Sequence, residues 1–162
     1  MAKGVLEKAM DLLAIRPLTA FELRTKLASY GRYSCEEIEE TLTFCRDRGY
    51  LNDALLAADT AQFLNSSGRG RGLIRKKLRL RGVSQEEISG ALEQLSGEDE
   101  QEAALNAARG KLRLLIREKD MKKKREKLFR FLISRGFTPD IAGNVLHELL
   151  SAQEQEEFPD SF

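Results

Sequence analysis

Hydrophobic positions along the chain recur every three or four residues, which is the period of an α-helix. Ile38, Leu42 and Cys45 are one example. Alternating runs rich in β-branched residues, the pattern of β-strands, are almost absent. The sequence therefore predicts an all-α fold. Helix breakers, which mark the expected helix ends, stand at Pro17, Gly31, Gly49, Gly68 to Gly72, Gly82, Gly97, Gly136 and Pro139.

Three segments of the chain share one pattern when they are aligned on a glycine. In each, two apolar residues four positions apart precede a glycine that lies four positions further on. Such a glycine suits the position just after a helix, where the backbone is left-handed and a residue without Cβ is not strained. The apolar pairs are Leu23 and Leu27, Ile74 and Leu78, and Leu128 and Leu132, and the glycines are Gly31, Gly82 and Gly136.

A hydroxyl residue soon after each glycine predicts the start of another helix. Ser34 and Ser84 are each followed three residues later by a glutamate, as in a capping box. Thr138 precedes Pro139, which suits the first position of a helix. The apolar faces expected on these helices are Ile38, Leu42 and Cys45; Ile88, Leu92 and Leu95; and Ala142, Leu146 and Leu149.

One further helix is expected before each of these helix pairs, over residues 4–15, 53–66 and 101–117. The chain then consists of three-helix repeats at residues 1–52, 53–100 and 101–150, followed by an acidic tail at 151–162 whose composition favours disorder. Repeats of this size are stabilised by stacking on their neighbours, so we expect an elongated, curved array. Arrays of this kind typically bind other macromolecules.

Charge is strongly segregated along the chain, although the net charge is only +1. Residues 66–82 and 109–135 hold 19 of the 27 lysines and arginines, while the last 26 residues hold six acids and no lysine or arginine. The sequence is therefore better described as two basic segments and an acidic tail.

The basic segments predict an outward-facing stripe on a helix in the second repeat and another in the third. With Ile74 and Leu78 facing inward, Arg75, Lys76 and Arg79 share an arc of about 100°. Two such stripes at equivalent positions favour an electropositive surface for phosphate backbones or acidic protein faces, whereas solvated helix faces are the alternative. The candidate contact residues are Arg69, Arg71, Arg75, Lys76 and Arg79 in the second repeat, and Lys122, Lys123, Lys127 and Arg130, interrupted by Glu126, in the third.

Catalytic and cofactor chemistry finds little support in the sequence. The glycines of the stretch SSGRGRGLIRKKLRLRG, residues 66–82, follow a helical segment rather than the strand that a dinucleotide-binding loop needs, and no lysine there precedes a serine or threonine. His147 is the only histidine, and Cys35 and Cys45 lie ten apart, so a zinc site lacks ligands. We expect both thiols to be reduced and half-buried, and we predict no catalytic residue, metal or cofactor.

A membrane-embedded or secreted protein is not indicated. No apolar run approaches the roughly 20 residues that span a bilayer, and the N-terminal residues are charged and amphipathic. We therefore expect a monomeric protein of the cytoplasm with no membrane partner.

Three stretches of the chain resemble the RecX family of bacterial regulators of the RecA recombinase. LLAIRPLTAFELRTKL, residues 12–27, is similar to the family's opening signature, and GYLND, residues 49–53, with Ala57 resembles its second. The basic glycine loop of residues 66–82, with its IxxxLxxRGV pattern and the acidic capped helix that follows, resembles the third. Departures are small: Asn52 replaces a commoner aspartate and Leu56 a usual aromatic residue.

This resemblance implies a non-enzymatic protein that binds the RecA filament on single-stranded DNA along its helical groove. It also implies inhibition of RecA ATP hydrolysis, strand exchange and coprotease activity, and so a role in DNA repair, homologous recombination and the SOS response. The alternative is a helical regulator that binds nucleic acid directly, because each predicted repeat has some likeness to helix-turn-helix modules. A helical scaffold for another partner is a third interpretation.

Overall fold

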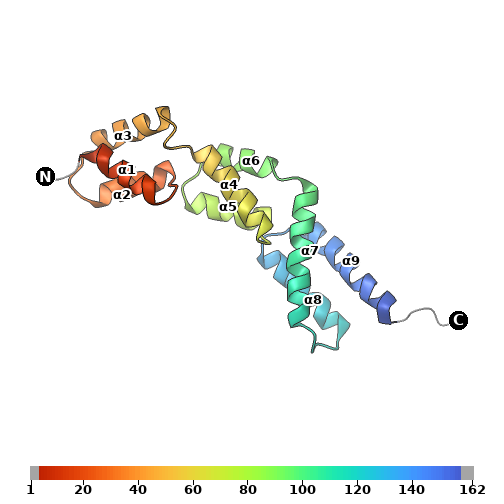
Figure 1. The fold of residues 1–162 in the computed structure, drawn as a ribbon. Helices are drawn as coiled ribbons and strands as arrows, with labels where there is room; N and C mark the ends of the chain where they lie inside the picture. Colours follow the sequence, from red (N-terminus) through yellow and green to blue (C-terminus); the bar gives the residue numbers. More distant parts are fainter. Residues whose placement is uncertain (1–3, 158–162) are drawn as a thin grey trace. The chain divides into compact units, whose positions relative to one another are not determined.

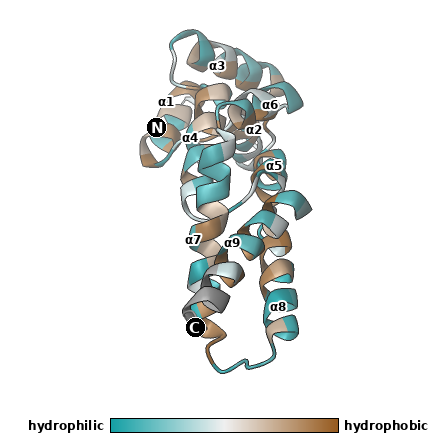
Figure 2. Cartoon of the chain, turned by 90° about the vertical axis from the view of Figure 1, so that its right-hand side faces the viewer, coloured by the Kyte–Doolittle hydropathy of each residue, from teal (hydrophilic) through white to brown (hydrophobic). Residues whose placement is uncertain are grey.

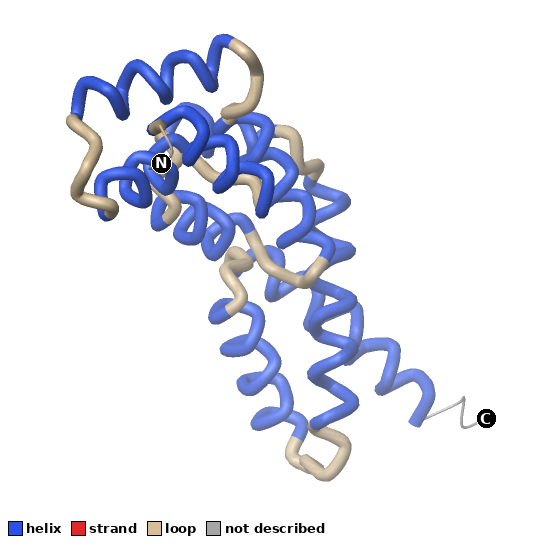
Figure 3. The backbone as a smooth tube through the Cα atoms, turned by 60° about the vertical axis from the view of Figure 1, so that its left-hand side comes forward, coloured by secondary structure: helices blue, strands red, loops and turns tan. Residues whose placement is uncertain are grey.

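The computed structural model describes the backbone of residues 4–157 and the side chains of residues 4–151. Every regular element in this part of the chain is an α-helix (Figure 3), which confirms the predicted fold class. Of the acidic tail that was predicted to be disordered, residues 151–157 continue helix α9, and residues 158–162 lie outside the described part. The helices are α1 (Val5–Ile15), α2 (Ala20–Ser29), α3 (Cys35–Asp47), α4 (Asp53–Ser66), α5 (Arg71–Leu80), α6 (Gln85–Glu93), α7 (Gly97–Leu114), α8 (Met121–Ser134) and α9 (Pro139–Glu157).

The helix ends follow the local signals in the sequence. Gly31, Gly82 and Gly136 have φ angles of 66°, 76° and 88° and stand two residues after α2, α5 and α8. Ser34 and Ser84 form the predicted capping boxes of α3 and α6. These short-range features confirm that each of the three segments is a helix, a left-handed glycine turn and a second helix.

The start of α7 differs from the prediction. It begins at Gly97, four residues before the expected position, because the side chain of Ser96 accepts the N–H of Asp99 and the Asp99 carboxylate accepts the N–H of Ser96. Gly97 is therefore the first residue of a capped helix rather than a breaker.

The described residues divide into two compact units, and the division falls within α4 and α5. The first unit comprises residues up to 60 together with 77–94. In it, α1, α2 and α3 pack against one another (Figure 1). Their shared core consists of Ala9, Leu18, Ala20, Leu23, Leu27, Ile38, Leu42, Cys45 and Leu51.

The second unit comprises residues 61–76 and the residues from 95 onward, and its main body is α7, α8 and α9 packed side by side. Figure 2 shows hydrophilic and hydrophobic residues alternating along α7 and α8, as in amphipathic helices. Two buried clusters hold the three helices together: Ala103, Ala104, Ala108, Leu132, Phe137, Ala142, Val145 and Leu149, and then Leu128, Leu146 and Leu150.

Within the first unit, the start of α2 packs on the turn between α5 and α6, a contact that we call the N-terminal junction. The Oγ1 of fully buried Thr19 donates a hydrogen bond to the carbonyl of Arg81 at 2.6 Å. The Arg81 guanidinium in turn donates to both carboxylate oxygens of Glu22 at 3.0 Å. Burial alone would raise the pKa of Glu22, but the hydrogen bonds from Arg81 and Thr19 and the charge of Arg81 lower it below its ordinary value.

The N-terminal junction also includes the first residue of α4. The N–H of Ala20 donates to both carboxylate oxygens of Asp53 at 2.9 and 3.1 Å, so an acid from α4 caps the start of α2. Burial raises the pKa of Asp53 despite this hydrogen bond. Phe21 covers Gly82, where an added Cβ would lie 2.3 Å from the phenylalanine.

Within the second unit, the start of α5 packs on the turn between α8 and α9, and we call this contact the C-terminal junction. The N–H of Gly70 donates to the carbonyl of Arg135 at 2.9 Å, and the N–H of Gly72 donates to that of Gly136 at 3.0 Å. A Cβ on Gly70 would lie 2.5 Å from the carbonyl group of Gly136. The glycines of the basic loop therefore allow two backbones to approach closely, which is a structural reason for their spacing.

Here too an acid from another helix, Glu100 of α7, caps the helix that packs on the turn. The N–H of Arg71 donates to the Oε1 of Glu100 at 3.2 Å, and the Nε of Arg71 lies 2.9 Å from the Oε2, an ion pair outside hydrogen-bond geometry. The same guanidinium donates to the carbonyl of Leu95 at 2.6 Å. Glu100 is only 3% exposed, and a buried carboxylate is costly unless it is paired. Arg71 provides this partner inside the second unit.

Candidate binding surface

The helix α5 carries the predicted basic face of the second repeat. Ile74 and Leu78 are fully buried, and Arg75, Lys76 and Arg79 are exposed. No carboxylate among the described residues lies within ion-pairing distance of these three cations, and Arg79 makes only a long hydrogen bond, 3.4 Å, to the Oε1 of Gln85. These charges are therefore available to an external anion.

The two arginines before this face differ from it. Arg69 is half-buried and donates to the carbonyl of Ser67. Arg71 is the first residue of α5, and its guanidinium is held by Glu100 and Leu95 in the C-terminal junction. Their assignment to a contact surface stays a prediction, and the contacts of Arg71 give it a packing role.

The third repeat carries its basic stripe on α8. Lys122, Lys123, Lys127 and Arg130 are all exposed. Lys127 donates to the Oε2 of Glu118 at 2.6 Å, which lowers the pKa of that carboxyl, and the Nζ of Lys123 lies 4.0 Å from the Oδ2 of Asp120. The α8 stripe is therefore partly neutralised, whereas the α5 face is not.

The second unit brings only part of the candidate set together. The hydrogen bonds of Gly70 and Gly72 fix the start of α5 beside the end of α8. Lys122 lies at the opposite end of α8, about 20 Å from Arg135 at a rise of about 1.5 Å per residue. Within this unit, Arg130 is consequently nearer to the start of α5 than Lys122 or Lys123 is.

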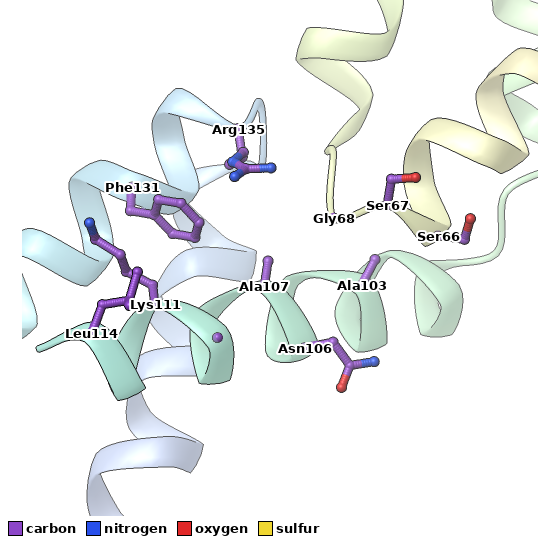
Figure 4. Close-up of a pocket in the computed structure, with 11 residues that line it drawn as sticks. Ser66, Ser67, Gly68, Ala103, Asn106, Ala107, Lys111, Leu114, Phe131 and Arg135 are labelled. Carbon is purple, nitrogen blue, oxygen red and sulfur yellow. The ribbon is translucent and has the colours of Figure 1, made fainter. Parts of the chain in front are cut away.

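A groove between α7 and α8 was not predicted from the sequence. It has a volume of about 610 Å³ and is lined by residues 66–68, by small and larger side chains of α7, by Phe131 of α8 and by Arg135 just after α8 (Figure 4). Lys111 of α7 and Arg135 both lie over the Phe131 ring, 5.6 and 4.9 Å from its centroid. The lining residues come from different elements and lie many positions apart in the sequence, so no local motif indicated the groove.

The described residues hold neither a metal-binding cluster nor a membrane-spanning helix. No group of three or more histidine, cysteine, aspartate or glutamate side chains in that part of the chain is placed to hold a metal ion. His147 is exposed on α9. Cys45 is a fully buried free thiol and Cys35 is exposed, so both differ from the predicted half-burial. None of the helices in the described part is both long and apolar enough to cross a membrane.

Two family models match the chain. The model of the first three-helix domain of RecX matches residues 6–45, and the model of the third three-helix domain matches residues 98–146. Both matches agree with the three-helix architecture predicted from the glycine-centred pattern.

Individual proteins show the same relationship. The regulatory protein RecX of Pasteurella multocida is 36% identical over 141 residues, which cover 86% of this chain and 84% of that protein. The regulatory protein RecX of Clostridium perfringens strain 13 is 32% identical over 140 residues, 85% of this chain and 65% of its own length. The crystal structure of RecX from Lactobacillus salivarius has a TM-score of 0.81 at 23% identity, covering 90% of this chain and 94% of that one, and this likeness bears on the fold alone.

Proposed function

The chain belongs to the RecX family of regulatory proteins, and on that premise we propose that it restrains the RecA recombinase by binding the RecA filament on single-stranded DNA. RecX proteins are regulators rather than enzymes. The chain acts by occupying a binding surface, and its effect is exerted on the reactions of its partner.

The proposed consequence of binding is slower ATP hydrolysis, strand exchange and coprotease activity by RecA. These reactions belong to homologous recombination, DNA repair and the SOS response. The observation that carries the proposal is the family relationship, which extends over 86% of the chain in the Pasteurella relative.

The α5 face is the surface that we assign to the filament. Arg75, Lys76 and Arg79 project from one helix with no carboxylate partner among the described residues, so binding a phosphate or an acidic side chain breaks no internal ion pair. Arg130 of α8 is a further candidate for the same reason. Unpaired cations attract an acidic partner over a distance of about 10 Å at ordinary ionic strength.

The rate of ATP hydrolysis by RecA on single-stranded DNA tests this function. Adding the chain at a stoichiometric ratio to RecA is expected to slow hydrolysis, and bovine serum albumin at the same concentration serves as the control for non-specific effects. An unchanged rate, with the chain folded by circular dichroism, rejects the proposal.

Direct binding to nucleic acid is the second candidate, and the unpaired α5 cations favour it as well. DNA binding measured without RecA at several salt concentrations separates the two functions. A steep log–log dependence on salt, about 0.9 per neutralised phosphate on duplex DNA and about 0.7 on single strands, supports direct binding. DNA binding that is absent without RecA, together with inhibited RecA, supports recognition of the filament.

A further inference from the structure

The groove between α7 and α8 is lined by both apolar and positively charged side chains. On the α7 side, Ala103 is buried and Ala107 lies against Gly68, whereas Gly110 has open space around its Cα and Leu114, 77% exposed, borders the groove further along the helix. On the α8 side stands Phe131, half-buried (Figure 4). Gly110 therefore leaves room for a bound side chain, and Leu114 offers it an apolar contact.

The groove is positively charged and contains no acid. Lys111 and Arg135 are its charged residues, and neither forms an ion pair within the described part of the chain. An adjoining hollow of about 350 Å³ shares Lys111 and Phe131 and adds Lys127 and Arg130, again with no acidic residue in its lining. Lys127 is paired with Glu118, so the two hollows together present three cations without an acidic partner in the described part of the chain, Lys111, Arg130 and Arg135.

The placement of the cations decides which class of partner suits the groove. A nucleobase would have to stack on a face of Phe131, the one aromatic ring in the lining. Lys111 and Arg135 both lie over that ring within 6 Å of its centroid, where a base would have to displace them. Carboxylates meet no such obstacle, because they can bind the outer side of each cation while the ring keeps its contacts.

We propose that this groove binds an acidic protein segment that carries an apolar side chain. Carboxylates of the segment pair with Lys111 and Arg135, and the apolar side chain lies beside Gly110 and contacts Leu114. This inference goes beyond the proposed function, because it specifies the chemistry of a bound segment and does not require the segment to belong to RecA.

Titration of the ¹⁵N-labelled full chain with the peptide Ac-EEFEE-NH₂, followed by NMR, tests the inference. The expected result is a saturable set of shifts at Lys111, Phe131, Arg135 and their neighbours. The uncharged peptide Ac-QQFQQ-NH₂ is expected to bind at least about tenfold more weakly, because it lacks the carboxylates.

Variants locate the site. Lys111→Glu is expected to weaken peptide binding by about tenfold or more, and Arg135→Gln serves as the second variant should the first fail to fold. Arg113→Glu is the matched control, since it makes the same change of charge at an exposed α7 residue outside the lining and is expected to retain most of the affinity.

Several outcomes would overturn the inference. Equal binding of the two peptides shows that carboxylates are not recognised, and an equal loss in Lys111→Glu and Arg113→Glu shows that only net charge matters. Groove shifts with an oligo-dT strand but not with the acidic peptide assign the groove to nucleic acid. Because none of these readouts includes RecA, a failure here is distinct from a failure of the proposed function.

Discussion

The N-terminal and C-terminal junctions both pack the start of a helix on a glycine turn, but different interactions hold the two contacts together. In both, the first turn of a helix, α2 or α5, packs on a left-handed glycine turn and is capped by an acid from the second helix further along the chain, α4 or α7. The N-terminal junction is made largely by side chains, including the ion pair of Arg81 and Glu22. The C-terminal junction is made by two hydrogen bonds between backbones, and its acid, Glu100, is the more deeply buried of the two.

Because of this difference, the N-terminal junction should tolerate substitutions better than the C-terminal junction. Side chains such as Phe21, which is half exposed, can adjust when a neighbour changes. Two backbones in contact cannot adjust without moving a helix, since Gly70 and Gly136 leave no space for a Cβ. Substitutions at the C-terminal junction should therefore lower the free energy of unfolding more than equivalent substitutions at the N-terminal junction. They should also lower it more than the same substitution at a glycine turn that belongs to neither junction.

The largest effect is expected for Gly136→Ala. The new Cβ would strain a backbone with φ of 88° and would lie 2.2 Å from the backbone nitrogen of Leu73. We expect a loss of about 3 kcal/mol or more in the free energy of unfolding, measured by urea denaturation.

Gly31→Ala is the matched control for this prediction. Gly31 occupies the equivalent turn with φ of 66° and has no atom within 4 Å of an added Cβ, so only the backbone strain remains, about 1 kcal/mol. Equal losses in the two variants would show that the backbone contact contributes nothing.

A smaller effect is expected for the capping acids. Glu100→Ala leaves the Arg71 N–H and guanidinium without their acid, and we expect a loss of about 2 kcal/mol. Asp53→Ala removes the acceptor of the Ala20 N–H but also relieves the burial that raises the pKa of Asp53, so about 1 kcal/mol is expected. Urea denaturation at pH 7 measures both, and a larger loss for Asp53→Ala would reverse the ranking of the junctions.

The smallest effect concerns pH. The lowered pKa of Glu22 means that its contribution is present above the ordinary value of 4.5 and disappears as the pH falls through the folded-state pKa. The difference in stability between the wild type and Glu22→Gln, measured by urea denaturation, should therefore shrink between pH 6 and pH 3.

Asp53 provides the control of opposite sign. Its pKa is raised, so protonation favours the folded state, and the wild type should gain stability relative to Asp53→Asn as the pH falls through that raised value. A shift in the same direction for both variants would contradict the electrostatic description of the N-terminal junction.

Local structure could be predicted from the sequence because it depends on residues close together in the chain. The turns at Gly31, Gly82 and Gly136 and the caps at Ser34 and Ser84 depend on contacts within a few residues. The early start of α7 was predictable in principle, because Ser96 and Asp99 have capping-box spacing, but glycine at the first helical position obscured it.

The junctions and the groove could not be predicted in this way. Thr19 and Arg81 are 62 residues apart, and no local pattern indicates that one hydrogen bonds to the other. Arg71 looks like its basic neighbours in the sequence, and only packing shows that its charge is already paired with Glu100. Lys111 and Arg135 likewise meet over Phe131 only because α7 packs on α8.

We propose that the chain restrains RecA through the α5 face, and charge reversal on α5 tests this proposal. The rate of ATP hydrolysis by RecA on single-stranded DNA is measured with the wild type, with Arg75→Glu/Arg79→Glu and with Arg113→Glu/Arg117→Glu, which changes the net charge equally at exposed residues outside the candidate set. We expect strong inhibition by the wild type and the control, and a loss of most inhibition in the α5 variant at unchanged helical content. Undiminished inhibition by Arg75→Glu/Arg79→Glu would contradict the claim.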